Sequence, residues 1–213
     1  MADSGEERKP ESTKSLVLAS GNEGKLRELR HMLDPLGWTI RLQSEWDIGE
    51  AVEDGGTFVE NALIKARHAA RHTGLPSLGD DSGLVVEALQ GAPGIFSSRY
   101  AGLHGDDAAN NLKLLDALQG IPGDQRSAHF YCALVLLRHA EDPAPILATG
   151  IWHGRIVDHP KGTWGFGYDP LFWVESHGCT SSELEPGVKN RLSHRGQALA
   201  ALVEQLGVLN STG

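Results

Sequence analysis

The sequence predicts an α/β fold in which helices flank a mixed β-sheet. Three features indicate this fold: an apolar strand followed directly by an amphipathic helix, two long apolar segments in succession, and a helical pattern near the C-terminus. A strand, a tight loop and a helix open a parallel α/β unit, whereas successive strands joined by a short loop pair antiparallel. The functional site is expected in loops at the strand ends.

The first half of the chain should hold two strands, two helices and a hairpin. The strands are expected over residues 16–20 and 39–44, each followed by a helix, over 25–33 and 57–74. The hairpin follows over residues 78–89. The longer helix is strongly amphipathic, and Gly74 and Pro76 terminate it. The hairpin, LGDDSGLVVEAL, is expected to be buried, with Asp80 and Asp81 just before its turn.

The second half should hold one more helical unit, the long strands and the terminal helix. A loop over residues 91–102 precedes a helix over 106–120, and strands follow over 128–138 and 145–157. A glycine-rich loop then enters a strand over 162–174, and the last helix covers 193–207. The two long strands should pair antiparallel. Ser193 is the expected N-cap of the terminal helix.

The length and composition fit a globular protein of one domain or of two tightly joined lobes. The 213 residues are 40% hydrophobic, enough for a substantial core, and the domain should cover residues 15–210. Residues 1–14 are nearly all polar or small and are expected to form a disordered extension. Cys132 in a strand and Cys179 in a polar loop are expected to be reduced thiols.

The net charge of −9, from 28 acidic and 19 basic residues, argues against broad binding to nucleic acid or to an anionic membrane. A polyanionic ligand must then meet a local group of cations. No apolar run reaches the roughly 18 residues of a membrane helix, and the N-terminus lacks the order of a secretion signal. A cytoplasmic location is therefore expected.

The turn SGNEGK, residues 20–25, joins the first strand to the first helix. Backbone N–H groups and the helix dipole at such an N-terminus attract an anion, and Lys25 adds a full positive charge. The GxxxxGK[ST] spacing of a Walker A loop is absent. Taken alone, the turn is better explained as ordinary helix capping by Asn22.

Three acidic residues and a lysine are candidates for a metal and phosphate site. Neighbouring side chains on a strand point to opposite faces, so only one of Asp80 and Asp81 should enter a cleft. With Glu53 they could form an oxygen cluster for a divalent cation. A plain turn at DDSG and a solvated helix face at Lys65 remain open alternatives. No GxSxG motif supports a serine hydrolase at Ser82.

Two further stretches could bind a planar base. FGYDP, residues 166–170, combines an aromatic ring, glycines and a carboxylate, which suits stacking and hydrogen bonding. SHRG, residues 193–196, places His194 and Arg195 at a helix N-terminus, with Lys189 shortly before it. Core filling and an ordinary surface pair are the respective alternatives.

Taken together, these stretches resemble the inosine-triphosphate pyrophosphatase family. Each motif is weak, but six in fixed order between Leu16 and about Leu206 are specific: SGNEGK, TFVENALIKA, DDSGL, GAPGIFSSRYAG, FGYDP and SHRGQA. The resemblance implies an elongated mixed sheet whose two lobes surround a cleft, and usually a homodimer. It also implies Mg²⁺-dependent hydrolysis of deaminated purine nucleoside triphosphates (ITP, dITP and XTP) to the nucleoside monophosphate and pyrophosphate.

The resemblance assigns a role to each candidate residue. Asp81 would bind the metal with Glu53 and act as the base, Lys65 would act in catalysis by holding the triphosphate, and Ser82 would contact the substrate. The turn that binds the triphosphate would comprise Ser20, Gly21, Asn22, Glu23, Gly24 and Lys25. The nucleoside pocket would comprise Phe166, Gly167, Tyr168, Asp169, Lys189, His194 and Arg195.

Two positions depart from the family pattern. Trp164 stands where a small residue is expected, which bears on pocket width, and Val52 stands where some members carry a second acid.

Two other functions compete with the hydrolase. A regulator that binds nucleotide without hydrolysis should lack a catalytic carboxylate or lysine, and a pyrophosphatase for modified pyrimidine nucleotides is not expected to carry FGYDP followed by SHRG.

Overall fold

The structure is a computed structural model that describes residues 14–34 and 37–211. The predicted N-terminal extension, residues 1–14, lies outside the described residues except for Lys14, which begins the first strand. Within the described residues, no helix is long and apolar enough to cross a membrane.

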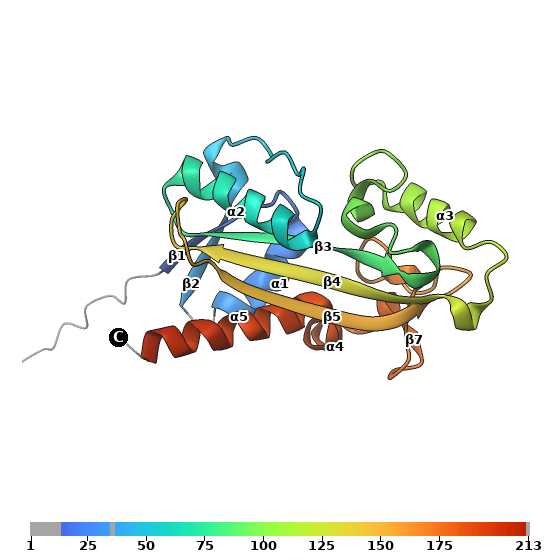
Figure 1. The fold of residues 1–213 in the computed structure, drawn as a ribbon. Coiled ribbons are helices and arrows are strands. Elements are labelled where there is room, and N and C mark those ends of the chain that lie inside the picture. The colour runs from blue at the N-terminus through green and yellow to red at the C-terminus, as the bar shows by residue number, and fades with distance from the viewer. Residues whose placement is uncertain (1–13, 35–36, 212–213) are drawn as a thin grey trace, which may run out of the picture.

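A seven-stranded mixed sheet forms the centre of the molecule (Figure 1). Its strands lie in the spatial order β2-β1-β3-β4-β5-β6-β7. Their bounds are Lys14–Leu18 (β1), Trp38–Leu42 (β2), Ser77–Val86 (β3), Ser127–Leu137 (β4), Ile146–Ile156 (β5), Phe172–Val174 (β6) and Cys179–Thr180 (β7). The first strand pairs parallel with β2 and β3, and all later pairs are antiparallel. The predicted mixed sheet and its antiparallel β4–β5 ribbon are confirmed.

Helices cover both faces of this sheet. Their bounds are Glu23–Leu33 (α1), Phe58–Thr73 (α2), Asp107–Ala117 (α3), Pro186–Leu192 (α4) and His194–Ser211 (α5). The Thr57 hydroxyl caps the start of α2, and Gly74 ends it with φ of 68°. Ser193 accepts a hydrogen bond from the Gly196 amide at 3.1 Å, as expected for an N-cap of α5.

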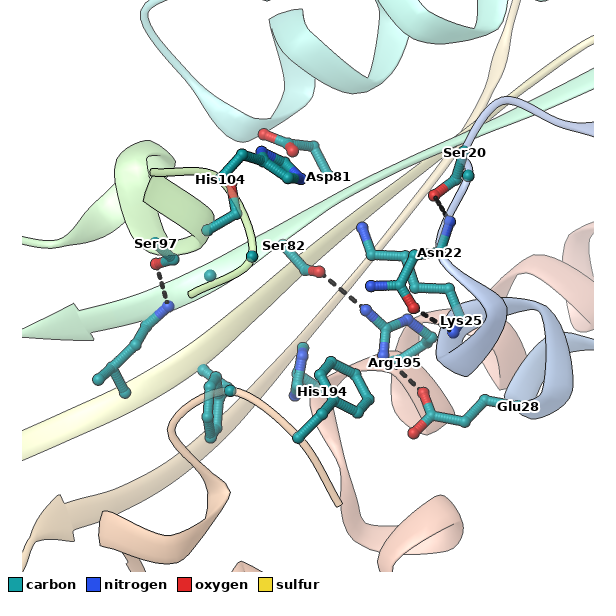
Figure 2. A pocket seen from close by; sticks show the side chains of 18 of the residues that line it. Ser20, Asn22, Lys25, Glu28, Asp81, Ser82, Ser97, His104, His194 and Arg195 are labelled. Atoms are coloured by element: carbon teal, nitrogen blue, oxygen red, sulfur yellow. Dashed lines mark hydrogen bonds and ion pairs between the residues drawn. The ribbon is translucent and has the colours of Figure 1, made fainter. Parts of the chain in front are cut away.

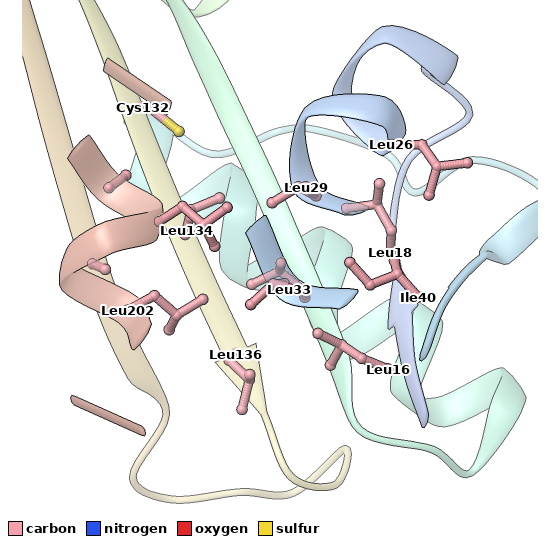
Figure 3. Packing of buried hydrophobic residues seen from close by; sticks show 14 of the residues in the cluster. Leu16, Leu18, Leu26, Leu29, Leu33, Ile40, Cys132, Leu134, Leu136 and Leu202 are labelled. Carbon is pink, nitrogen blue, oxygen red and sulfur yellow. The ribbon is translucent and has the colours of Figure 1, made fainter. Parts of the chain in front are cut away.

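The core is divided between the two faces of β4 because successive side chains alternate. Leu134 and Leu136 pack with the leucines of α1 and α5 (Figure 3). Ala133 and Val135 pack under Ala62 and its neighbours on α2, on the opposite face. Helices α1 and α5 therefore lie on one side of the sheet and α2 on the other (Figure 1).

The predicted hairpin at residues 78–89 is wrong. Strand β3 runs straight through DDSG and pairs with β4 from Ser77↔Leu137 to Val86↔Ala128. The glycines that suggest a turn serve close packing instead. A Cβ on Gly79 would lie 1.9 Å from the carbonyl oxygen of Ala62 in α2, and one on Gly83 would lie 2.5 Å from that of Gly94.

Smaller differences concern short elements. The second strand ends at Leu42, and residues Gln43–Trp46 form a 3₁₀ turn. Helix α4 and strand β7 have no counterpart among the sequence predictions. Cys179 lies in β7 rather than in a loop, and both cysteines are free, as expected.

A cleft opens where β1 ends. The first strand stops at Leu18, but β3 continues to Val86, so most of β3 has no parallel neighbour on that side. The chain connections diverge at this point, which is the preferred place for ligands in open α/β sheets. A cavity of about 450 Å³ lies here, lined on one side by the turn after β1 and helix α1 and on the other by the segment that leads into α3. The assignment of residues 15–210 to one two-lobed domain stays a prediction.

Candidate active site

The cavity brings together candidate residues from both halves of the chain. It is lined by residues of the turn after β1, the loop before α2, strand β3 and the segments around α4. The candidate residues among its lining are Ser20, Gly21, Asn22, Lys25, Glu53, Lys65, Asp81, Ser82, Phe166, Gly167, Tyr168, Asp169, Lys189, His194 and Arg195. The side chain of Glu23 lies outside what the structure describes. Gly24 is not in the lining, but a Cβ on it would lie 3.4 Å from the Phe166 ring.

Asp81 and Lys65 form the acidic and basic centre of the cavity. Lys65 Nζ donates to Asp81 Oδ1 at 2.6 Å and to Glu53 Oε2 at 3.3 Å. Burial raises the pKa of the Asp81 carboxyl, although the Lys65 charge opposes this. Burial would lower the pKa of Lys65, but the charges of Asp81 and Glu53 raise it. The second oxygen of Asp81, Oδ2, is buried and has no hydrogen-bond partner in the part of the chain that the structure describes.

Asp80 lies on the other face of β3 and is fully buried. Its Oδ1 accepts from Lys25 Nζ, and its Oδ2 accepts from Arg195 Nε, both at 2.7 Å. Burial alone would raise the pKa of this carboxyl, but the charges of Arg195 and Lys25 hold the pKa well below its usual range. Asp80 does not line the cavity, whereas Asp81 does. The prediction that one aspartate enters the cleft is confirmed.

The turn after β1 is organised by its own side chains. The Asn22 side chain accepts from the amides of Gly24 at 2.8 Å and Lys25 at 3.1 Å, and Ser20 Oγ accepts from the Asn22 amide. Because this Asn N-cap already bonds the Gly24 and Lys25 amides, these two groups are not free to bind an anion. The helix-capping interpretation is confirmed, and Lys25 is the cationic residue of this turn that lines the cavity.

The loop carrying FGYDP forms the other end of the cavity. Lys189 Nζ lies 5.0 Å from the centre of the ring of Phe166, an exposed residue. Asp169 is buried and accepts from Lys189 Nζ at 2.6 Å and from the Phe166 amide at 2.9 Å. The Tyr168 hydroxyl donates to the Ser97 carbonyl at 2.9 Å. Asp169 and Tyr168 thus fix this loop, while the Phe166 ring remains available for stacking.

Arg195 is the most constrained cation of the site (Figure 2). Its Nε binds Asp80, one terminal nitrogen binds Glu28 Oε2 at 2.5 Å, and the other binds Ser82 Oγ at 2.9 Å. Each terminal nitrogen carries a further N–H group that can donate to a ligand. The neighbouring His194 ring stacks on Phe130 at 4.8 Å. Burial holds the pKa of His194 well below its ordinary value, so the imidazole is neutral.

The sequence interpretation missed Glu28 and Asp107. Glu28 lines the cavity from α1, and Asp107 accepts a 2.7 Å hydrogen bond from the Gly167 amide. Glu28 follows Lys25 by three residues on a helix, and this spacing could have revealed that the two side chains share a face. No comparable signal links Asp107 to the distant Gly167.

The two departures from the family pattern lie outside the cavity lining. The Trp164 side chain is 56% exposed, and its amide is bound to the Ser182 carbonyl at 3.0 Å. Val52 is 80% exposed and lines a separate groove beside α2. The Trp164 side chain therefore does not set the width of this cavity.

The residues present fit a hard divalent cation. Among the described residues, no group of three or more His, Cys, Asp or Glu side chains is arranged to hold a metal. Glu53 and Asp81 nevertheless share one cavity, and none of the described residues bonds the buried Asp81 Oδ2. Mg²⁺ often takes only one or two protein carboxylates and completes its shell with water and phosphate oxygens.

The fold and the site define an α/β protein whose cleft combines cations for a polyanion with an exposed aromatic ring. The sequence profile of the Ham1 family matches residues 16–205. The chain belongs to the Ham1 family, and the resemblance noted in the sequence is confirmed.

Close relatives and solved structures agree with this assignment. The chain is 56% identical over 193 residues to the dITP/XTP pyrophosphatase of Vibrio cholerae, covering 91% of this chain and 96% of that protein. The structure of a HAM1 protein from Coxiella burnetii matches with a TM-score of 0.84 and 48% identity, covering 94% of this chain and all of the other. A dITP/XTP pyrophosphatase from Mycobacterium abscessus matches with a TM-score of 0.73 and 42% identity, covering 90% of this chain and 99% of that chain.

Proposed function

We propose that the protein hydrolyses ITP, dITP and XTP to the nucleoside monophosphate and pyrophosphate. The observation that carries this proposal is that Lys25, Lys65 and Asp81 line the same cavity as Phe166. Lysines and a carboxylate suit a triphosphate, and the aromatic ring suits a purine. The relatives named dITP/XTP pyrophosphatase support the same reaction.

In this proposal the triphosphate lies between the turn after β1 and helix α2. Lys25 and Lys65 bind phosphate oxygens, and Asp81 accepts the proton of the attacking water. Glu53 and Asp81 would hold Mg²⁺, which when bound neutralises phosphate charge and acidifies water. Lys65 Nζ already donates to both carboxylates, so it holds both side chains in orientation before substrate arrives.

The purine base is selected at the opposite end of the cavity, by hydrogen-bond donors on the protein. The side chains of Lys189 and Arg195 offer hydrogen-bond donors and no acceptors. They suit the 6-oxo group of hypoxanthine or xanthine and oppose the 6-amino group of adenine. Discrimination based on unpaired buried polar groups reaches about 10⁴-fold. Guanine also carries a 6-oxo group, so its rejection requires a further contact.

A panel of nucleotides tests the proposal. Purified protein is incubated with ITP, dITP, XTP, ATP, GTP and UTP, with Mg²⁺ or with EDTA, and pyrophosphate and orthophosphate are measured. We expect pyrophosphate from the first three nucleotides and only when Mg²⁺ is present. Equal turnover of ATP would refute the base selection, and orthophosphate as the sole product would refute the bond assignment. Binding of ITP without any turnover would favour the regulator.

Replacing Lys25 should lower the affinity for the triphosphate group. Lys25→Ala removes the cation nearest the turn, so the Kd for ITP should rise by about tenfold, the value of one charged hydrogen bond. Binding of IMP should change less, because it carries fewer phosphates. Calorimetry of both ligands with an inactive background measures this. Lys161→Ala, an exposed lysine outside the cavity, is the matched control, and equal losses for ITP and IMP would contradict the placement.

The assembly state and the location in the cell extend the proposal. We propose a homodimer, as the family resemblance implies. Light scattering should then give about twice the 22.9 kDa mass of the chain. A mass equal to one chain at micromolar concentration would contradict it. The cytoplasmic location stays a prediction.

A further inference from the structure

Asp80 connects the two ends of the cleft without lining it. The Asp80 side chain is fully buried and binds Lys25 from α1 through one oxygen and Arg195 from α5 through the other. Ser82 Oγ lies 3.2 Å from Asp80 Oδ1 and 2.9 Å from an Arg195 terminal nitrogen. In the proposed function, Lys25 contacts the phosphates and Arg195 contacts the base.

We infer that Asp80 is a positioning residue that sets the spacing between the phosphate-binding and base-binding cations. This inference rests on the proposed function. One carboxylate fixes two flexible side chains in relation to each other, so a nucleotide of the right length meets both without first ordering them. Asp80 thereby couples recognition of the triphosphate to recognition of the base.

The charge arrangement explains why a buried carboxylate is retained here. Lys25 and Arg195 would repel each other and would lose hydration at the cleft wall if no anion lay between them. Asp80 stays ionised because both cations bind it. The carboxylate can take one cation on each oxygen, which an asparagine amide cannot do, since its nitrogen is a donor.

Glu28 provides a matched comparison. It binds Arg195, and its other oxygen lies 3.9 Å from Lys189 Nζ, so both of its cationic partners belong to the base end. Lys25 has its ion pair with Asp80. Loss of the Glu28 charge should therefore disturb base recognition alone, whereas loss of the Asp80 charge should disturb both ends.

The test compares Asp80→Asn with Glu28→Gln. For each variant, kcat and KM are measured with ITP and ATP, and the affinities for ITP and IMP are measured in the presence of EDTA. Asp80→Asn should raise the KM for ITP about tenfold, in line with the loss of a charged hydrogen bond, with a smaller effect on kcat. Both the ITP-to-ATP preference and the ITP-to-IMP affinity ratio should fall. Glu28→Gln should lower only the ITP-to-ATP preference.

A charge-balanced double variant guards against misfolding. Asp80→Asn with Lys25→Met removes one anion and one cation, and circular dichroism checks the fold of every variant. Against a Lys25→Met background, the Asp80 change should no longer affect the ITP-to-IMP ratio but should still lower the ITP-to-ATP preference.

Two outcomes would overturn the inference. One is a folded variant that lacks the Asp80 charge but keeps both the ITP-to-ATP preference and the ITP-to-IMP affinity ratio. The other is a variant in which kcat falls at constant KM. Failure of the unmodified protein to hydrolyse ITP would instead refute the proposed function.

Discussion

Asp81→Asn should reduce turnover of ITP by about 10³-fold or more while nucleotide binding is largely kept. Asparagine preserves the shape of the side chain, but it cannot accept the proton of the attacking water and binds a divalent cation poorly. The proposed role depends on the buried Asp81 Oδ2, which has no hydrogen-bond partner among residues 14–34 and 37–211. Lys65 keeps its contact with Glu53, so the phosphate-binding cation stays in place.

Single-turnover kinetics and calorimetry with ITP measure the two quantities separately. Asp116→Asn, an exposed aspartate on α3, is the matched control and should behave like the unmodified protein. Near-normal turnover of Asp81→Asn would rule out Asp81 as the base. A loss of binding as large as the loss of turnover would show that Asp81 serves mainly in holding substrate.

Gly79→Ala should lower the free energy of unfolding by about 3 kcal/mol, the upper range for overpacking a tight contact. The added methyl group would overlap the Ala62 carbonyl oxygen, which belongs to the backbone of α2 and cannot rotate away. Helix α2 must therefore move from the sheet. Since Lys65 lies on the same helix and Asp81 on the same strand as Gly79, their 2.6 Å contact should loosen and turnover should fall.

Urea unfolding followed by circular dichroism measures the stability change. Gly207→Ala is the matched control, because a Cβ there meets no atom of the described residues within 4 Å and the residue lies in the α5 helix. Alanine in a helix is expected to be neutral or to stabilise by up to about 1 kcal/mol. Equal stability of Gly79→Ala and Gly207→Ala would contradict the close packing of α2 on β3.

The main helices and long strands could be predicted because their patterns are local. Thr57 and Gly74 mark both ends of α2, and the alternating residues of β4 and β5 predict paired strands. The hairpin prediction failed because a glycine in a strand pattern can mark either a turn or a close contact with another element, and the sequence does not distinguish the two. At Gly79 the cause is a helix from elsewhere in the chain, which only tertiary structure reveals.

The candidate site was predictable in its residue types but not in its internal contacts. The fixed order of motifs led to Lys25, Lys65 and Asp81, and the structure places all three in one cavity. The partners of Arg195 could not be inferred, because Asp80 is 115 residues away and Glu28 is 167 residues away along the chain. Spacing carries no information about pairs separated by several elements.

A crystal structure of Asp81→Asn with ITP and Mg²⁺ tests the central claim most directly. The account predicts the triphosphate between Lys25 and Lys65, with the hypoxanthine ring on Phe166 and its 6-oxo group facing Arg195. A nucleotide bound in the reverse direction, or outside the cavity at the end of β1, would contradict the account.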